Sequence, residues 1–146
     1  MKRRVAEQTH TVPFKLVTPT QIIFEGDADL VIAVTTEGEE GILPRHAPFL
    51  AALKPGVLRA NVVSGGASSR LELATSEGFM QALPDGVTVL VDEAVRFDDV
   101  LVADVRQQLR EAIERQKAAG ADPALFAREQ AAIDFAEAKL RLTGHK

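Results

Sequence analysis

The sequence predicts a two-part chain, an antiparallel β-sandwich or barrel followed by an antiparallel two-helix hairpin. Residues 1–97 of the 146 hold 24 of the 30 Val, Ile and Thr, eight of the ten Gly and six of the seven Pro, whereas residues 98–146 hold eleven Ala. Side chains that branch at Cβ favour a pleated sheet, and Ala loses little conformational freedom in a helix. The composition therefore places a boundary near residue 97.

Short apolar runs, many of them alternating with polar residues, predict the strands of the first part. They occupy residues 12–17, 22–24, 30–34, 57–63, 69–74, 78–83 and 87–91. Gly26-Asp27 separates the second run from the third, and Ser64-Gly65-Gly66 predicts a hairpin between the fourth and fifth. Pro84-Asp85-Gly86 predicts another hairpin, with Gly86 at a positive φ. Many short strands joined in this way favour a sandwich or barrel.

Two helices are predicted after residue 97. Apolar residues at the spacing of one helical face occupy positions 101, 102, 105, 109, 112 and 113, and Asp98 or Asp99 is expected to cap this helix. Gly120 suits a left-handed helix end, and Asp122-Pro123 supplies a cap and a first turn for the second helix. The second apolar stripe is Phe126, Ile133, Ala136 and Leu140. The short connection makes the helices antiparallel, and their narrow stripes predict a weakly anchored hairpin.

Composition excludes several classes of function. The chain has no Cys, which excludes disulfides, Cys-bound metals and thiol catalysis, and its net charge of -4 disfavours a nucleic-acid binder. No apolar run approaches the ~18 residues of a membrane span. The basic start, residues 1–4, is not followed by the apolar run of a signal peptide. We therefore expect a soluble, intracellular protein.

Few residues point to chemistry. The three His stand far apart, at positions 10, 46 and 145, so no metal site is predicted. The acidic cluster at 37–40 is a cation-site candidate, but a solvated turn is the favoured interpretation. His46 is a candidate general base without an obvious orienting carboxylate, and a structural or interface role is favoured. An alternative therefore stays open, a small β-sandwich enzyme or ligand-binding module that uses His46 and Glu39.

The most distinctive segment is residues 39–50, a loop braced by two prolines and one glycine. It combines apolar Ile42, Leu43 and Phe49 with charged Glu39 and Arg45, the arrangement of a partner-binding patch. A strand-to-strand crossover that buries its own apolar side chains is the other interpretation. The charged faces of the predicted hairpin fit either a solvated helix surface or a docking surface.

Residues 38–48 read Gly-Glu-Glu-Gly-Ile-Leu-Pro-Arg-His-Ala-Pro, and at this segment the chain resembles the epsilon subunit of the rotary F-type ATP synthase. The family pattern is close to Gly-Glu-x-Gly-Ile-x-Pro-x-His-x-Pro. The similarity continues through Pro55-Gly56 and runs from about residue 14 to 142. It implies a flattened β-sandwich of about ten strands followed by two antiparallel helices. It also implies a non-catalytic subunit of the central stalk, which couples proton or sodium flow to ATP synthesis.

The resemblance implies specific partners. The β domain, residues 1–97, is expected to bind the γ subunit and the c ring, on the cytoplasmic face of the membrane. The loop equivalent to 37–46 meets the c subunits in this family. The implied contact residues are Glu39, Glu40, Gly41, Ile42, Leu43, Arg45 and His46.

The hairpin, residues 98–146, is mobile in this family and inhibits ATP hydrolysis when it extends into the catalytic head. Arg128, Lys139 and Arg141 of this chain are candidates to meet acidic segments of the catalytic α and β subunits. Some members bind ATP through a motif close to Ile/Leu-Asp-x-x-Arg-Ala at the start of the hairpin. Residues 100–106 read Val-Leu-Val-Ala-Asp-Val-Arg and lack it, so neither a nucleotide nor another cofactor is expected.

Overall fold

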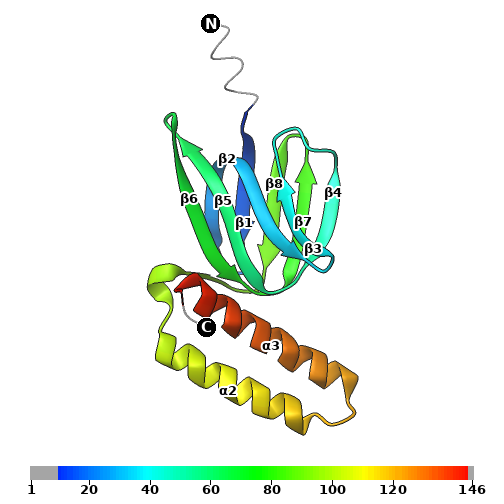
Figure 1. Ribbon diagram of the computed structural model, residues 1–146. Coiled ribbons are helices and arrows are strands. Elements are labelled where there is room, and N and C mark those ends of the chain that lie inside the picture. The colour runs from blue at the N-terminus through cyan, green and yellow to red at the C-terminus, as the bar shows by residue number, and fades with distance from the viewer. Residues whose placement is uncertain (1–9, 145–146) are drawn as a thin grey trace, which may run out of the picture.

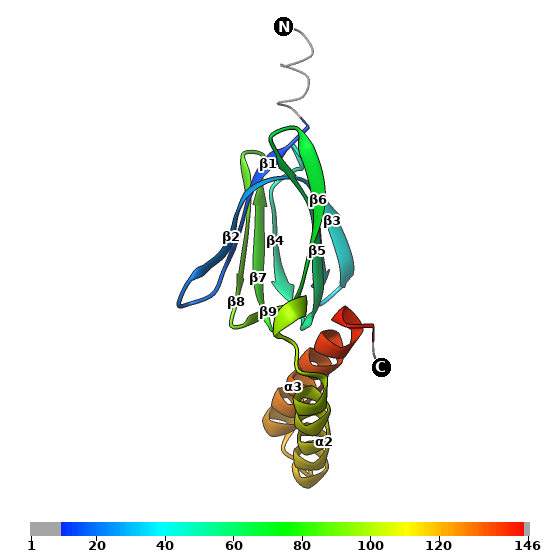
Figure 2. The same ribbon diagram turned by 90° about the vertical axis from the view of Figure 1, so that its left-hand side faces the viewer.

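The computed structural model describes residues 10–144, so the basic start of the chain and His145 lie outside it. The described residues form nine strands and then two long helices, which confirms the predicted fold class with nine strands in place of about ten. Figures 1 and 2 show two layers of strands with both helices at one end. The elements are β1 (Val12–Val17), β2 (Ile22–Thr35), β3 (Gly38–Ile42), β4 (Phe49–Leu53), β5 (Gly56–Ser64), β6 (Ala67–Thr75), β7 (Gly78–Leu83), β8 (Gly86–Val91), β9 (Ala94–Arg96), the 3₁₀ turn η1 (Phe97–Asp99), α2 (Val102–Ala118) and α3 (Pro123–Leu142).

One long strand, β2, joins the two layers. Its first half pairs with β1, which continues through β8 and β7 to β4. Its second half pairs with β3 and β5, and β5 leads to β6 and β9. The hydrogen-bonded ring closes where Thr35 of β2 pairs with Leu53 of β4. Between the layers lies one apolar core, whose largest fully buried side chains include Phe14, Leu16, Ile42, Leu58, Leu73 and Met80.

The predicted break at Gly26-Asp27 is wrong, because β2 runs through it. Gly26 pairs with Phe14 of β1, and a Cβ at Gly26 would lie 2.9 Å from the ring of Phe24. The glycine therefore makes room for an aromatic ring that packs on the core instead of forming a turn. The strand passes from one layer to the other at an irregularity between Ala28 and Leu30.

Both predicted hairpins of the β part are present, as β5–β6 and β7–β8. Gly65 and Gly66 have φ values of 59° and 82°, conformations that glycine adopts without strain. Gly86 does not have the predicted positive φ. It is the first residue of β8 and pairs with Leu83, so Pro84 and Asp85 form the turn by themselves.

The helical caps are partly as predicted. Asp122 accepts hydrogen bonds from the backbone N–H groups of Ala124 and Leu125, both at 3.1 Å, and Gly120 has a φ of 59°. The expected caps Asp98 and Asp99 lie instead in η1, and α2 begins after Leu101 without a side-chain cap. The proximal half of the α2–α3 seam is apolar and buries Val105, Ala136 and Leu140.

The distal half of the same seam is polar. Arg115 of α2 pairs with the buried Glu129 of α3 at 2.9 Å, and Gln116 donates to Gln130 at 2.8 Å. In the described residues one apolar cluster joins the hairpin to the sheets, with Phe135 and Ala138 of α3 packed against Ala74 of β6 and with partly buried Val57, Val95 and Leu142 around them. The weak anchoring of the hairpin stays a prediction.

Gly78 permits the close approach of β7 to β8. A Cβ at this position would lie 1.9 Å from the carbonyl oxygen of Leu90, a backbone atom that cannot move away alone. We expect Gly78→Ala to lower the free energy of unfolding by more than about 2 kcal/mol. Gly86→Ala, at the other end of the same strand pair, meets its nearest atom at 3.7 Å and is the matched control. Urea unfolding of both variants tests this, and equal losses would contradict it.

Candidate functional site

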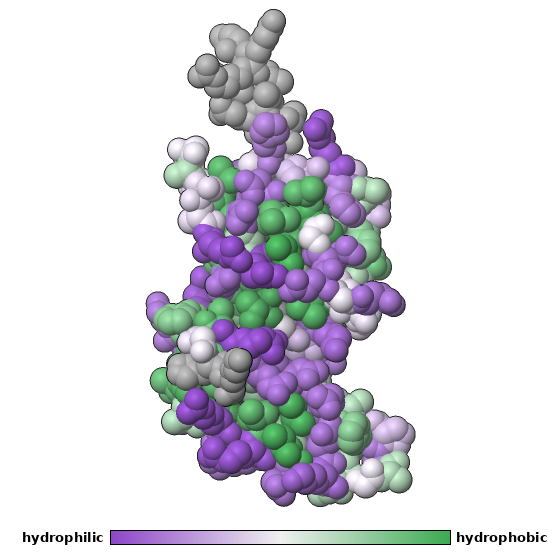
Figure 3. Space-filling model, viewed as in Figure 1, coloured by the Kyte–Doolittle hydropathy of each residue, from purple (hydrophilic) through white to green (hydrophobic). Residues whose placement is uncertain are grey.

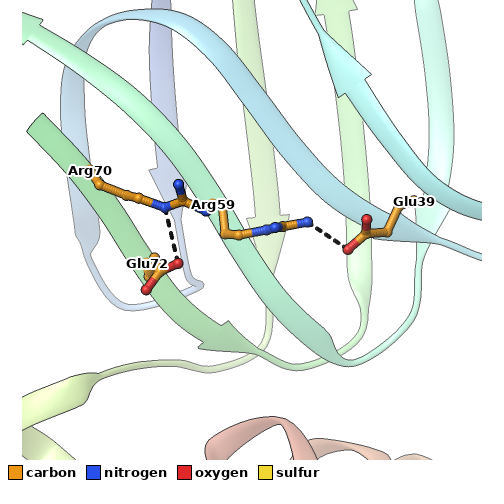
Figure 4. Close-up of polar contacts among 4 residues, drawn as sticks. All are labelled: Glu39, Arg59, Arg70 and Glu72. Carbon is orange, nitrogen blue, oxygen red and sulfur yellow. Dashed lines mark hydrogen bonds and ion pairs between the residues drawn. The ribbon is translucent and has the colours of Figure 1, made fainter. Parts of the chain in front are cut away.

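The distinctive segment begins at Glu39, near the helical end of the sandwich. Glu39 points outward from β3, and Arg59 of β5 donates to its carboxylate at 2.7 Å (Figure 4). A shallow hollow of about 370 Å³ beside this ion pair is also lined by Arg141 of α3. Glu39 therefore shares this hollow with guanidinium groups of two different elements, and it is paired with that of Arg59. Figure 3 shows this face, on which apolar side chains lie between charged ones.

The structure corrects the predicted position of Ile42. Its side chain was expected at an interface, but it is 0% exposed and lies in the core, opposite Val31 of β2. Side chains alternate along β3, so the residue three positions after outward-facing Glu39 points inward. Gly41 faces outward, and Glu40 is half-buried opposite Ala33. A charge that points inward on an edge strand hinders pairing with a strand of another molecule, which gives Glu40 a structural role.

The loop after β3 presents the remaining predicted residues. Leu43 is 59% exposed, and Arg45 adopts a φ of 62°, the left-handed region that a non-glycine residue rarely occupies. His46 packs edge-on against Phe49 with ring centroids 5.9 Å apart, and its Nδ1 lies within hydrogen-bonding distance of the Ala47 carbonyl. The loop predicted over residues 39–50 is therefore shorter in the structure, because its first part belongs to β3 and its last residues belong to β4.

Glu39 and His46 do not converge. Ile42 stands three positions after Glu39, roughly 10 Å along the strand, and His46 lies in the loop beyond, at the end of the sandwich away from the helices (Figure 1). Each residue has a different neighbour, Arg59 for Glu39 and Phe49 for His46. This geometry does not provide the paired base and carboxylate of the enzyme alternative. Among residues 10–144, no three His, Asp or Glu side chains form a metal-binding group.

The candidate hairpin residues face the β domain. Arg128 and Lys139 line a groove of about 400 Å³ between α3 and the sheets, together with Glu77 and Glu93. The Lys139 ammonium lies 4.3 Å from the centroid of the Phe135 ring and donates to Gln108 at 3.1 Å. Burial lowers the pKa of Lys139, and the negative charge of Glu93 acts in the opposite direction.

One apolar surface of the protein was not predicted from the sequence. Exposed and half-buried apolar side chains cross the outer face of the layer that contains β1, β8, β7 and β4. They form a row of register partners on five strands. We call this the apolar row, and its members are Ile22 of β2, Val17 of β1, Leu90 of β8, Phe79 of β7 and Ala52 of β4.

Phe79 is 58% exposed, and Ile22 and Leu90 are also exposed. Leu50 of β4 and Leu83 of β7 are exposed as well. The sequence did carry a signal for this surface. Residues 78–83 are apolar at odd and even positions, which is typical of a strand covered on both faces.

Comparisons with known proteins identify the family. The family description "ATP synthase, Delta/Epsilon chain, beta-sandwich domain" matches residues 11–97. Two similar relatives are named ATP synthase epsilon chain. The protein of Chromobacterium violaceum is 39% identical over 127 residues, which cover 87% of this chain and 89% of the relative. That of Xanthomonas campestris pv. campestris (strain B100) is 41% identical over 132 residues, 90% of each chain.

The chain belongs to the ATP synthase epsilon-chain family. The predicted family is therefore confirmed, and with it the role of a non-catalytic stalk subunit. Solved structures support the epsilon-chain fold. A chain of the Euglena gracilis mitochondrial ATP synthase superposes with a TM-score of 0.74 at 22% identity, covering 93% of this chain and 82% of that one. A chain of the Tetrahymena thermophila central stalk and c-ring structure gives 0.61 at 16% identity, covering 90% and 96%.

A further observation bears on membrane association of this epsilon chain. Within residues 10–144, neither α2 nor α3 combines the length and the hydropathy that a membrane-spanning helix needs.

The neighbouring residues Ile42 and Leu43 differ in burial, because Ile42 lies in the core and Leu43 lies on the surface. Ile42→Ala removes buried methyl groups and should cost about 2–5 kcal/mol of unfolding free energy. Leu43→Ala changes an exposed side chain and should cost no more than about 0.5 kcal/mol. Urea unfolding of the two variants measures the difference. Similar losses at both positions would show that the loop is packed into the core.

Proposed function

We propose that the chain is the rotor subunit that links γ to the c ring and so couples proton or sodium flow to ATP synthesis. The apolar row is the observation that carries this proposal. A face with Ile22, Phe79 and Leu90 in contact with water is unfavourable for a free monomer, and contiguous patches of this kind are typical of protein interfaces. The proposed occupant is γ, which the family resemblance supplies as the partner of the β domain.

The closed strand pairing supports a mechanical role. Torque passes through a body only if the body does not shear, and β2 connects the two layers by continuous backbone and hydrogen bonds. A close-packed core resists deformation as well. The described part of the β domain, residues 10–97, is accordingly the rigid part of the proposed coupling element, held at the cytoplasmic face of the membrane through the complex.

The c-ring contact is assigned to the outward-facing groups of the distinctive segment. Glu39 stands at one end of β3, while Leu43, Arg45 and His46 stand in the loop at its other end. In this assignment Ile42 packs in the core and fixes the loop, and it does not itself contact the c ring. Charged and polar side chains suit a partner whose loops are polar.

The hairpin, residues 98–146, is proposed as a mobile inhibitor of ATP hydrolysis. A switch needs two states within a few kcal/mol, and the small Phe135–Ala138–Ala74 cluster gives the docked state little apolar stabilisation. On release, Arg128, Lys139 and Arg141 become free to meet acidic segments of the catalytic subunits.

Phe79→Ser tests the γ contact. Loss of a phenyl group from a buried interface costs roughly 1.5–3 kcal/mol, so binding to γ should weaken about 10- to 100-fold in a titration calorimeter. Phe97→Ser is the matched control, because Phe97 is also 58% exposed but lies in η1, outside the apolar row. Equal binding by the two variants would place the γ contact elsewhere.

Truncation after residue 97 tests the inhibitory role. Synthase assembled with the shortened chain should bind γ normally and hydrolyse ATP faster than synthase with the full chain. A coupled assay of ATP hydrolysis measures the change. Unchanged hydrolysis, with γ bound, would contradict inhibition by the hairpin of this protein.

A further inference from the structure

Opposite charges face one another across the groove between the β domain and the hairpin. Two loops at the helical end of the sandwich, between β6 and β7 and between β8 and β9, contribute the acidic side. We call these three residues the acidic latch: Glu77, Asp92 and Glu93. The helices contribute Arg115, Arg128 and Lys139 to the same groove. The loop between β4 and β5 adds Pro55, while its Lys54 does not line the groove.

Direct ion pairs do not hold the hairpin in place. Among residues 10–144, every ion pair within 4 Å joins two residues of the β domain or two residues of the hairpin. The apolar contact is small, with Phe135 and Ala138 against Ala74 at its centre. The opposite charges that line the groove are therefore a second candidate for what favours docking, beside this apolar contact.

Lys139 is the basic residue whose charged state depends most on its surroundings in the groove. Docking places its ammonium in a half-buried position over Phe135, which disfavours the charged form, and the Glu93 carboxylate offsets that cost. Removal of the acidic charge would leave a half-buried cation without compensation. If the hairpin swung away, Lys139 would keep Phe135 and Gln108 of the hairpin as neighbours and would lose the nearby charge of Glu93.

We propose that the acidic latch holds the hairpin docked by attracting Arg128 and Lys139, so that an acidic partner surface and the latch compete for the same basic side chains. This inference rests on the proposed mobility of the hairpin and adds the groups that control it. Its consequence is a docking equilibrium that depends on ionic strength, because charges separated by a solvated groove are screened by salt.

The experiment uses the full chain in isolation. Because the chain has no Cys, the changes Ser69→Cys on β6 and Ala121→Cys at the tip of the hairpin allow two spin labels to report the distance between them. Glu93→Lys should lower the ratio of docked to undocked hairpin roughly tenfold. Asp85→Lys, the same charge change in the turn at the opposite end of the sandwich, is the matched control and should leave the ratio unchanged.

Exchanging the charges of Glu93 and Lys139 distinguishes the loss of electrostatic attraction from a general disruption of the structure. Lys139→Glu alone should also release the hairpin, and Glu93→Lys combined with Lys139→Glu should dock better than either single variant. A rise in NaCl should undock the parent chain more than the Glu93→Lys variant. The proposal is overturned if Glu93→Lys behaves like Asp85→Lys, or if the swap is no better docked than its single changes. Neither result bears on γ binding or on hydrolysis by the truncated chain, which test the proposed function separately.

Discussion

The closure of the sheet through β2 is the constraint on which the rest of the structure depends. One strand of 14 residues pairs with β1 in one layer and with β5 in the other, and its last residue meets β4. Because of this closure, both layers keep a fixed relation without a disulfide, which the chain cannot form. The two outer faces and the loops at each end are therefore presented by one stiff body.

The connection to the hairpin has the opposite character. The β domain has a continuous apolar core, whereas α3 is attached through a small cluster around Phe135 and a groove lined with charges. The hairpin has its own seam, apolar near the β domain and polar near its tip, where Arg115 meets buried Glu129. A difference in anchoring of this kind is what the proposed roles need, one part transmitting force and the other moving.

The sequence predicted features that depend on local chemistry. The double glycine at 65–66, the Asp122 cap and the Gly120 helix end are each determined by a few adjacent residues. Features determined by distant packing were not predictable. Gly26 looks like a turn residue until the Phe24 ring is placed above it, and only the register of β3 with β2 turns Ile42 inward. The apolar row joins five strands from separate parts of the chain, and the local signal in residues 78–83 concerns β7 alone, so the row as a whole was not predictable.

We expect this chain to work only as part of a larger rotor, and the mass of its complex with γ is the decisive measurement. Native mass spectrometry of the purified chain mixed with γ should give one species that contains one copy of each. Loss of that species when Phe79 is changed to Ser, but not when Phe97 is, would locate the contact. Two separate masses at micromolar concentrations of both native chains would contradict the account.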